Sequence, residues 1–317
     1  MKTKISGSTI VVTGGAGFLG KHVVKKLKLL KPKKIIIPRS KDCDLRNFRN
    51  CLKVTKNSDF VIHMAGNVGG IGYNQKHPAE LFDDNILMGV NIMRAARQNK
   101  IKKFVAVGTV CSYPKFAHVP FKEVDLWSGY PEETNAPYGL AKKMLLVQAQ
   151  AYRQEYNFNA IYLLPVNLYG IGDNFDPESS HVIPSLIKKF IDARDKHSKD
   201  VVVWGTGRAT REFLYVEEAA EGIVNALQNY DKADPVNLGS SYEISIANLA
   251  KTISKIVGYK GEIIFDSTKP DGQPRRKLDT TRAFKEFGFK SKIDFRDGLT
   301  KTINWYEQIF TKKTKKS

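Results

Sequence analysis

Short apolar runs rich in β-branched residues alternate with longer segments whose apolar positions recur at helical spacing. The predicted strands are Ile10–Thr13, Ile35–Ile37, Asp59–Met64, Phe104–Val107 and Ala160–Leu164, and the predicted helices are Phe18–Leu30, Pro78–Gln98 and Tyr138–Tyr156. The strands are continuously apolar, which is typical of a parallel sheet covered on both faces. The alternation therefore predicts an α/β fold built on a doubly wound parallel sheet.

The pattern changes after Asn167, where loops become longer and richer in Gly, Pro, Asn and Asp. We interpret residues 1–167 as a first domain to which later segments return, and residues 168–311 as mainly a smaller mixed lobe. Residues 312–317 form a tail that carries four lysines. Such an end is typically frayed and solvated.

The composition of the 317 residues is that of a globular protein, with 42% hydrophobic and 26% charged residues. Three cysteines are too few for a disulfide scaffold, and none has a metal-site spacing. No apolar run approaches the roughly 20 residues needed to span a bilayer. The first residues lead directly into a strand, without the pattern of a signal peptide. We expect a cytoplasmic protein with no membrane contact and no bound metal.

The chain has 51 Lys and Arg against 32 Asp and Glu, a formal charge of +19. This charge predicts an anionic partner without identifying it. A non-catalytic RNA-binding protein is one alternative. The sequence lacks a basic stripe with interleaved aromatic residues, so nucleic acid is not the expected partner.

A glycine-rich turn, Gly14, Gly17 and Gly20 in a GxxGxxG pattern, follows the first predicted strand and opens a helix. Glycine lets the backbone approach a pyrophosphate, and the helix N-terminus offers free N–H groups and a positive dipole end. Within a βαβ pattern this turn predicts a dinucleotide-binding Rossmann domain. Arg39 and Ser40 follow the second strand, with no acid before Asp42. An Arg there suits the 2′-phosphate of NADP, so we expect NADP.

Tyr138 and Lys142 form a YxxxK pattern that places both side chains on one helix face. A nearby ammonium stabilises a phenolate, so we expect Lys142 to lower the pKa of Tyr138. Such a tyrosine can protonate a carbonyl oxygen as hydride reaches its carbon. Thr109, at the end of a predicted strand, can hydrogen-bond the same oxygen, and Ser112 is an alternative for that role.

The glycine-rich turn, the hydroxyl at the end of a strand and the YxxxK pattern are together typical of the short-chain dehydrogenase/reductase superfamily. Within its extended branch, the chain resembles the GDP-L-fucose synthase family, the GDP-4-keto-6-deoxymannose 3,5-epimerase/4-reductases, from about Thr9 to Trp305. The matching segments are Val68–Ile71, Cys111–Lys115, Asn135–Tyr138, Pro165–Gly170, Asp173–Phe175, Ser180–Pro184, Val201–Gly205, Arg211–Leu214 and Lys269–Arg275.

The resemblance implies a GDP-sugar substrate, an NADPH-dependent reduction at C4 and inversion at C3 and C5 by a cysteine and a histidine. The catalytic residues would be Thr109, Cys111, Tyr138, Lys142 and His181. NADP would be bound by Gly14, Gly17, Phe18, Leu19, Gly20, Arg39, Ser40, Asp44, Leu45, Ala65, Tyr138, Lys142, Asn167 and His181. The sugar nucleotide would contact Lys189, Trp204, Arg211, Asp271 and Arg276. The resemblance also implies a homodimer formed by the helices Pro78–Gln98 and Tyr138–Tyr156.

Several positions depart from the family pattern. Thr109 replaces a common serine and Val110 a small polar residue, Asn67 stands where some relatives carry lysine, and Ala16 lacks the arginine that some relatives place in the glycine loop. These departures leave open an enzyme for another GDP-4-keto sugar, such as a heptose or a dideoxy sugar. A separate alternative is an NAD-retaining sugar-nucleotide 4-epimerase or 4,6-dehydratase, against which Arg39, Cys111 and His181 argue.

Overall fold

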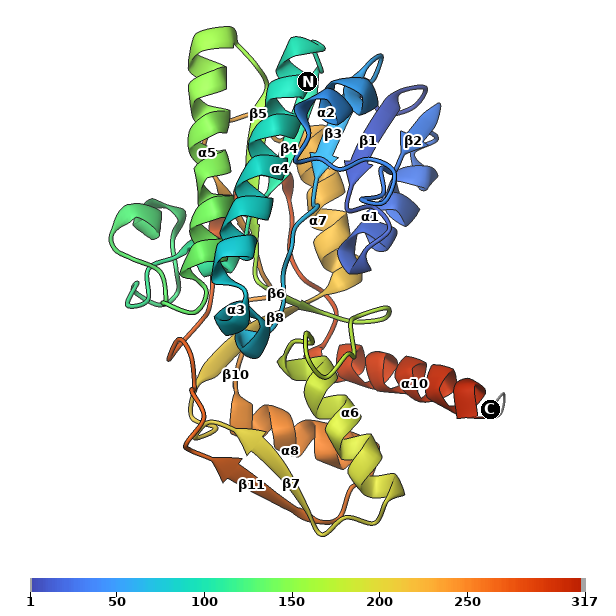
Figure 1. The fold of residues 1–317 in the computed structure, drawn as a ribbon, viewed down its shortest axis with the longest axis vertical. Helices are drawn as coiled ribbons and strands as arrows, with labels where there is room; N and C mark the ends of the chain where they lie inside the picture. Colours follow the sequence, from blue (N-terminus) through green and yellow to red (C-terminus); the bar gives the residue numbers. More distant parts are fainter. Residues whose placement is uncertain (1, 315–317) are drawn as a thin grey trace.

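The computed structural model describes residues 2–314, with side chains to residue 309. A six-stranded parallel sheet has the order β2-β1-β3-β4-β5-β9. Its strands are β1 (Thr9–Thr13), β2 (Lys34–Ile36), β3 (Phe60–His63), β4 (Lys103–Val107), β5 (Ala160–Pro165) and β9 (Val236–Leu238). The order reverses direction beside β1, as in a doubly wound sheet, so the predicted fold class is confirmed (Figure 1).

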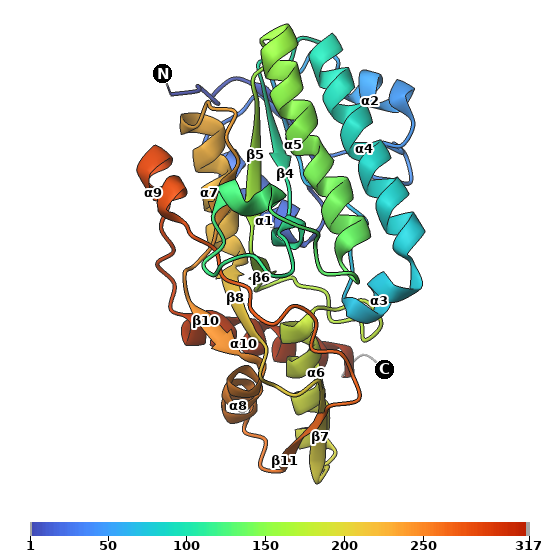
Figure 2. The ribbon, with the colours of Figure 1, turned by 90° about the vertical axis from the view of Figure 1, so that its left-hand side faces the viewer.

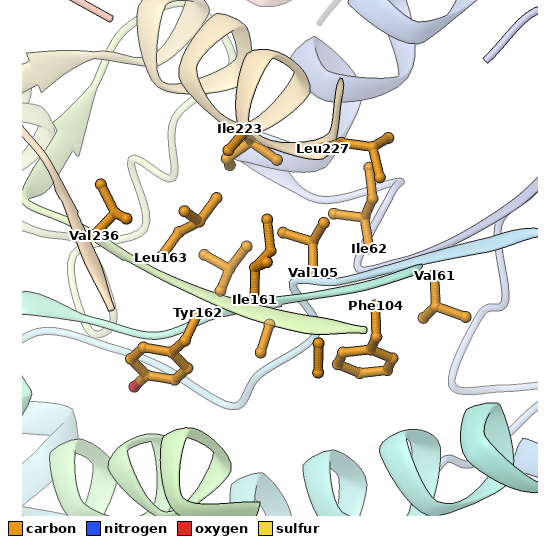
Figure 3. Close-up of a cluster of buried hydrophobic side chains, with 14 of the residues drawn as sticks. Val61, Ile62, Phe104, Val105, Ile161, Tyr162, Leu163, Ile223, Leu227 and Val236 are labelled. Atoms are coloured by element: carbon orange, nitrogen blue, oxygen red, sulfur yellow. The ribbon is translucent and has the colours of Figure 1, made fainter. Parts of the chain in front are cut away.

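Helices cover both faces of this sheet. One face carries α1 (Phe18–Leu29), α7 (Val216–Asn229) and α9 (Thr281–Phe287), and the other carries α2 (Phe48–Thr55), α4 (Pro78–Gln98) and α5 (Ala136–Tyr156). In Figure 3, Ile62 and Val105 point toward Ile223 of α7, whereas Phe104 and Tyr162 point to the opposite helix layer. Burial on both faces explains why the strand sequences are continuously apolar.

A smaller body lies beyond the carboxyl ends of the large sheet (Figures 1 and 2). It contains the sheet β10-β8-β6 and the pair β11-β7. Their bounds are β6 (Asn167–Tyr169), β7 (Asp200–Trp204), β8 (Thr210–Tyr215), β10 (Glu243–Ser245) and β11 (Glu262–Asp266). The helices α6 (Val182–Asp195), α8 (Ile246–Val257) and α10 (Phe295–Thr314) pack around a second apolar core. Between these segments the chain returns to the large sheet through α7, β9 and α9. The domain bounds at residue 167 and residue 311 remain an interpretation.

Three short helices complete the described chain: α3 (Ile71–Lys76), η1 (Val110–Ser112) and η2 (Glu123–Trp127). None of the helices within residues 2–314 combines the length and the apolar character needed to cross a membrane. The basic tail at 312–317 lies partly outside the described residues, which end at 314.

Candidate active site

A cavity of about 1000 Å³ lies where the carboxyl ends of the large sheet face the smaller body. This is the position at which open α/β sheets bind ligands. Apart from the alternative Ser112, all the candidate catalytic, cofactor and substrate residues named above line this cavity, although they come from distant parts of the chain. The volume is at the upper end of the range of about 300–1,000 Å³ that is usual for ligand sites.

The glycine loop forms one end of the cavity. Gly14 has a φ of +71°, and a Cβ there would lie 2.8 Å from the main-chain nitrogen of Ala65. A Cβ on Gly20 would lie 2.0 Å from the Gly14 oxygen. Both positions therefore require glycine. Gly17 caps α1 without any side-chain hydrogen bond, so the first N–H groups of that helix are available to an anion at the cavity wall.

Arg39 and Ser40 are exposed at the rim of the cavity beside this loop. Arg39 makes no ion pair with any residue in the described chain, so its charge is available to a ligand. Asp44 differs, because its carboxylate accepts hydrogen bonds from Arg46 and its pKa is lowered by them. The loop, the uncapped helix and an unpaired arginine fit a phosphorylated dinucleotide.

Thr109, Tyr138 and Lys142 converge on the middle of the cavity. Thr109 follows β4 and caps η1, where its Oγ1 accepts from the Cys111 N–H at 3.2 Å. Tyr138 lies in the first turn of α5, and its hydroxyl hydrogen-bonds Thr109. Lys142, one turn later, donates from Nζ to the Ala65 carbonyl at 3.4 Å. The structure thus brings the predicted Tyr, Lys and Thr to the same wall.

The electrostatics of this group differ from the expectation. Burial, and then proximity to Cys111, raises the pKa of Tyr138, and only the hydrogen bond from Thr109 opposes the shift. Lys142 is not among the groups that change it, so the predicted lowering is wrong for this structure. Burial lowers the pKa of Lys142 to about 8. Tyr138 is therefore a protonated phenol at neutral pH, suited to giving a proton.

Ser112, the alternative to Thr109, is fully buried and does not line the cavity. Its hydroxyl donates to the Gly139 carbonyl at 2.9 Å and so ties η1 to α5. The geometry favours Thr109 as the strand-end hydroxyl of the site.

Cys111 and His181 lie at the starts of two different helices that face the cavity. Cys111 is in η1, with Sγ 3.7 Å from Asn135 Oδ1 and 3.6 Å from Arg276 Nη1. His181 caps α6. His181 is exposed, but partial desolvation of its ring at the cavity wall, followed by the charge of Arg276, lowers its pKa and favours the neutral imidazole. Both groups can exchange protons with a ligand in the cavity.

The far end of the cavity is formed by the smaller body. Trp204 is half exposed, with the ammonium groups of Lys189 and Lys269 at 6.0 Å and 5.6 Å from its ring centroid. Arg211 donates to the carbonyls of Thr210 and Asp271 and has no ion pair among residues 2–309. Burial, and then the charge of Arg276, lowers the pKa of Arg211 to about 9. This end offers an aromatic face and cations, which suits a nucleoside diphosphate.

The carboxylate of Asp271 accepts hydrogen bonds from the N–H and the hydroxyl of Thr206 at 2.8 Å and 2.7 Å. It lines the cavity as predicted, while its oxygens hold the turn after β7. Three further residues at the site had no role assigned from the sequence: Asn135, Lys269 and Gln273. Asn135 directly precedes Pro137–Tyr138, and a polar residue flanking that motif is the one signal that could have pointed to it.

No group of three or more His, Cys, Asp or Glu side chains in the described part of the chain is arranged to hold a metal ion.

Comparison with known proteins places these features in a family context. The profile of the NAD dependent epimerase/dehydratase family matches residues 10–239. A putative GDP-L-fucose synthase 2 of Arabidopsis thaliana is 37% identical over 96% of this chain and 93% of its own. A GDP-L-colitose synthase of Yersinia pseudotuberculosis is 36% identical over 94% and 97%.

Two solved structures are also similar over nearly the whole chain. A GDP-6-OMe-4-keto-L-xylo-heptose reductase from C. jejuni has a TM-score of 0.91 and 26% identity, and it covers 98% of this chain and 100% of its own. A GDP-L-fucose synthetase from Naegleria fowleri, bound to NADP, has a TM-score of 0.85 and 29% identity over 96% of each chain.

Proposed function

Because the chain belongs to the NAD-dependent epimerase/dehydratase family, and within it to the GDP-sugar epimerases and reductases, we propose that it makes GDP-L-fucose. It would invert C3 and C5 of GDP-4-keto-6-deoxy-D-mannose and then reduce C4 with NADPH. The observation that carries the proposal is the placement of Cys111 and His181 around the cavity that also holds Thr109, Tyr138 and Lys142. An NAD-retaining 4-epimerase or 4,6-dehydratase does not invert C3 and C5, so it would not need Cys111 and His181 as an acid and base pair.

Inversion at C3 and C5 uses the acidity that the 4-keto group gives to both neighbouring C–H bonds. Each inversion needs a base on one face of the sugar and an acid on the other. Cys111 on η1 and His181 at the start of α6 come from different elements that line the cavity. A thiol and an imidazole both change protonation near neutral pH when their surroundings assist. We assign them as the acid and base pair.

Reduction at C4 uses Thr109, Tyr138 and Lys142. When bound, the nicotinamide cofactor supplies the hydride. Tyr138 gives its proton to the C4 oxygen, and Thr109 hydrogen-bonds the same oxygen. Lys142 lies between Tyr138 and the loop after β3, where its ammonium can hold a ribose hydroxyl. The uncapped N-terminus of α1 and the unpaired Arg39 support NADP as the cofactor.

Binding of the sugar nucleotide falls to the smaller body. Arg211 would contact the diphosphate, because a partly buried guanidinium without an ion pair is stabilised by an anion in the cavity. Trp204 offers a flat aromatic surface, with Lys189 and Lys269 beside it. Asp271 and Arg276 complete the wall around the same ligand.

A second candidate substrate is another GDP-4-keto sugar, such as a dideoxy sugar or a heptose. The GDP-L-colitose synthase, 36% identical, supports it, and so do a GDP-6-OMe-4-keto-L-xylo-heptose reductase and a GDP-mannoheptose C4 reductase, which are 26% identical but match nearly the whole chain. Thr109 and Val110 lie at the reacting end, where they could select among such sugars.

We also infer a homodimer in which α4 and α5 of two copies meet. Leu87 and Val90 of α4 and Val147 of α5 are 46%, 37% and 44% exposed. Apolar side chains on a pair of adjacent helices favour self-association.

The purified protein tests the proposal directly. We expect it to oxidise NADPH with GDP-4-keto-6-deoxymannose and to incorporate deuterium from D₂O at C3 and C5 of the product, measured by mass spectrometry and NMR. A matching assay with GDP-4-keto heptose and dideoxy sugars ranks the second candidate by kcat/KM. Tightly held NAD that is never consumed, with no NADPH oxidation on any 4-keto sugar, would overturn the proposal.

A further inference from the structure

Arg276 is a buried arginine that touches the candidate catalytic thiol. The residue is 6% exposed, in the segment between β11 and α9. Its Nη1 lies 3.6 Å from Cys111 Sγ, although 165 residues separate the two in sequence. Arg276 makes no ion pair with any carboxylate among the described side chains.

Neighbouring groups fix the guanidinium in this orientation. Nε donates to Gln273 Oε1 at 3.1 Å, and Nη1 also donates to Asn167 Oδ1 at 3.2 Å. Gln273 is itself held by the carbonyls of Pro114 and Lys115, in the segment that follows η1. The main chain of Arg276 accepts from the Glu212 N–H at 2.8 Å. The segments that carry Cys111 and Arg276 are therefore joined independently of the contact between the two side chains.

A buried guanidinium without an anion is costly, because the charge has left water and gained no opposite charge. Gln273 and Asn167 offer only neutral oxygens. In the free protein, the side chain that contacts the guanidinium and can become an anion is the Cys111 thiol, since a thiolate next to an arginine is a stabilised state. We propose that Arg276 is a positioning residue for Cys111, holding Sγ toward the cavity and stabilising its thiolate form. The catalytic meaning of this pairing rests on the proposed function, but the pairing itself belongs to the free protein.

Other polar and charged groups surround the Cys111 thiol. Asn135, the residue before α5, accepts from the Sγ–H, and its own amide donates to Glu132. Tyr138 of α5 is neutral at neutral pH. Arg211 of β8 is close enough for its charge to interact with a thiolate. His181 at the start of α6 is neutral, as described above. Arg276 is the cation in direct contact with Sγ.

The reactivity of the thiol measures this pairing without any sugar substrate. The experiment follows iodoacetamide alkylation of the Cys111 peptide by mass spectrometry, from pH 5 to pH 10, in the free enzyme. Peptide mapping separates Cys111 from Cys43 and Cys51. In Arg276→Gln we expect the midpoint of the rate profile to move up by about one pH unit, with a roughly tenfold slower rate at pH 7. Arg276→Lys keeps a cation and should restore most of the shift.

Arg275→Gln is the matched control, because Arg275 is exposed and pairs with Glu243 instead of the thiol. Its profile should match the wild type. Gln273→Met loosens the guanidinium without removing it and should give a smaller shift in the same direction. This variant keeps the test available should Arg276→Gln prove unfolded by circular dichroism.

A folded Arg276→Gln with an unchanged profile, or an equal shift in Arg275→Gln, would overturn the pairing. If the profile shifts but no 4-keto sugar is turned over, the proposed function fails and the pairing stands. If the enzyme turns over a 4-keto sugar but the alkylation profile of Arg276→Gln is unchanged, the proposed function stands and the pairing of Arg276 with Cys111 fails.

Discussion

Tyr138 is the residue whose protonation state sets the reduction step. Burial raises the pKa of its phenol, so the proton is available for the C4 oxygen throughout the neutral range. Replacing Tyr138 with Phe removes the donor, and we expect C4 reduction to fall by about 10²–10⁴-fold. Deuterium exchange at C3 and C5 should persist, because it depends on Cys111 and His181. NADPH oxidation and product mass spectra measure the two steps separately.

Tyr162→Phe is the control for Tyr138→Phe, since it also deletes a buried tyrosine hydroxyl. That hydroxyl donates to the Lys142 carbonyl and does not line the cavity. Its reduction rate should remain within a few-fold of wild type. Equal loss of reduction and of exchange in Tyr138→Phe would show that the tyrosine supports the whole site instead of one step.

Lys142 gives the site a pH dependence of known sign. Burial lowers its pKa to about 8, so the ammonium is present below that pH and is lost above it. If the ammonium holds the cofactor, NADPH affinity should fall as pH rises from 7 to 9, by up to about tenfold per pH unit above the pKa. A fluorescence titration at constant ionic strength measures it.

Lys142→Met should bind NADPH more weakly than wild type and with little change between pH 7 and pH 9. A wild-type affinity that stays constant over this range, or a variant with the same slope, would contradict the assignment of the ammonium to cofactor binding.

At the residue scale, sequence spacing predicts which side chains meet only when they are local. The i,i+4 spacing placed Tyr138 and Lys142 on one face of a helix, and α5 has them there. Spacing carries no information on burial, and burial reverses the expected direction of the Tyr138 pKa shift. The contact between Cys111 and Arg276 depends on how β11 and α9 are joined, and no local pattern reports that.

At the element scale, the long periodic segments are the most predictable. The helix predicted at Pro78–Gln98 has those bounds, and the buried strands agree within one or two residues. The smaller body was not predictable in detail. Its strands β6 and β10 have three residues each, and β7 pairs with β11 across some sixty residues of chain. Short strands with distant partners leave little periodicity in the sequence.

The close approach of α5 to η1 is an element-scale device that places the catalytic groups. A Cβ on Gly139 would lie 2.3 Å from the Cys111 carbonyl oxygen, so the two backbones meet there. Gly139→Ala would force η1 away from α5, displacing Cys111 and Thr109 relative to Tyr138. Because displacements of about 1 Å can cost about 10²-fold in rate, we expect a loss of that order in kcat/KM. Steady-state kinetics measures it.

Gly89→Ala is the matched control, at a second close contact of α5, the one with α4. Its Cβ would meet the Leu145 side chain at 2.5 Å, which overpacks the contact between α4 and α5 without touching η1. Overpacking costs typically about 1–3 kcal/mol of stability. We expect both variants to lower the thermal midpoint, and only Gly139→Ala to lose most of its activity. Parallel activity losses would mean that global destabilisation explains both.

At the scale of the whole molecule, part of the surplus positive charge is concentrated at the cavity. Arg39, Lys142, Arg211 and Arg276 line the cavity, and the three arginines make no ion pair among the described residues. These cations face the site of two expected anionic ligands, a phosphorylated dinucleotide and a sugar nucleotide. The sequence predicted this anionic partner from charge alone, but only the fold shows which cations converge.

The proposed dimer is also a property of the whole molecule, and the apolar face of α4 and α5 tests it. Leu87 and Val90 are three residues apart on α4, and Gln148 of α5 donates to the Val90 carbonyl, so the two helices present a continuous surface. Leu87→Glu would place a charge in the contact between two copies. We expect a dimer for the wild type and a monomer for this variant by sedimentation velocity.

Leu29→Glu is the control, because Leu29 is 74% exposed on α1, on the opposite face of the sheet, and should leave the dimer intact. A wild-type monomer at micromolar concentration, or dissociation by Leu29→Glu as well, would exclude the α4–α5 interface.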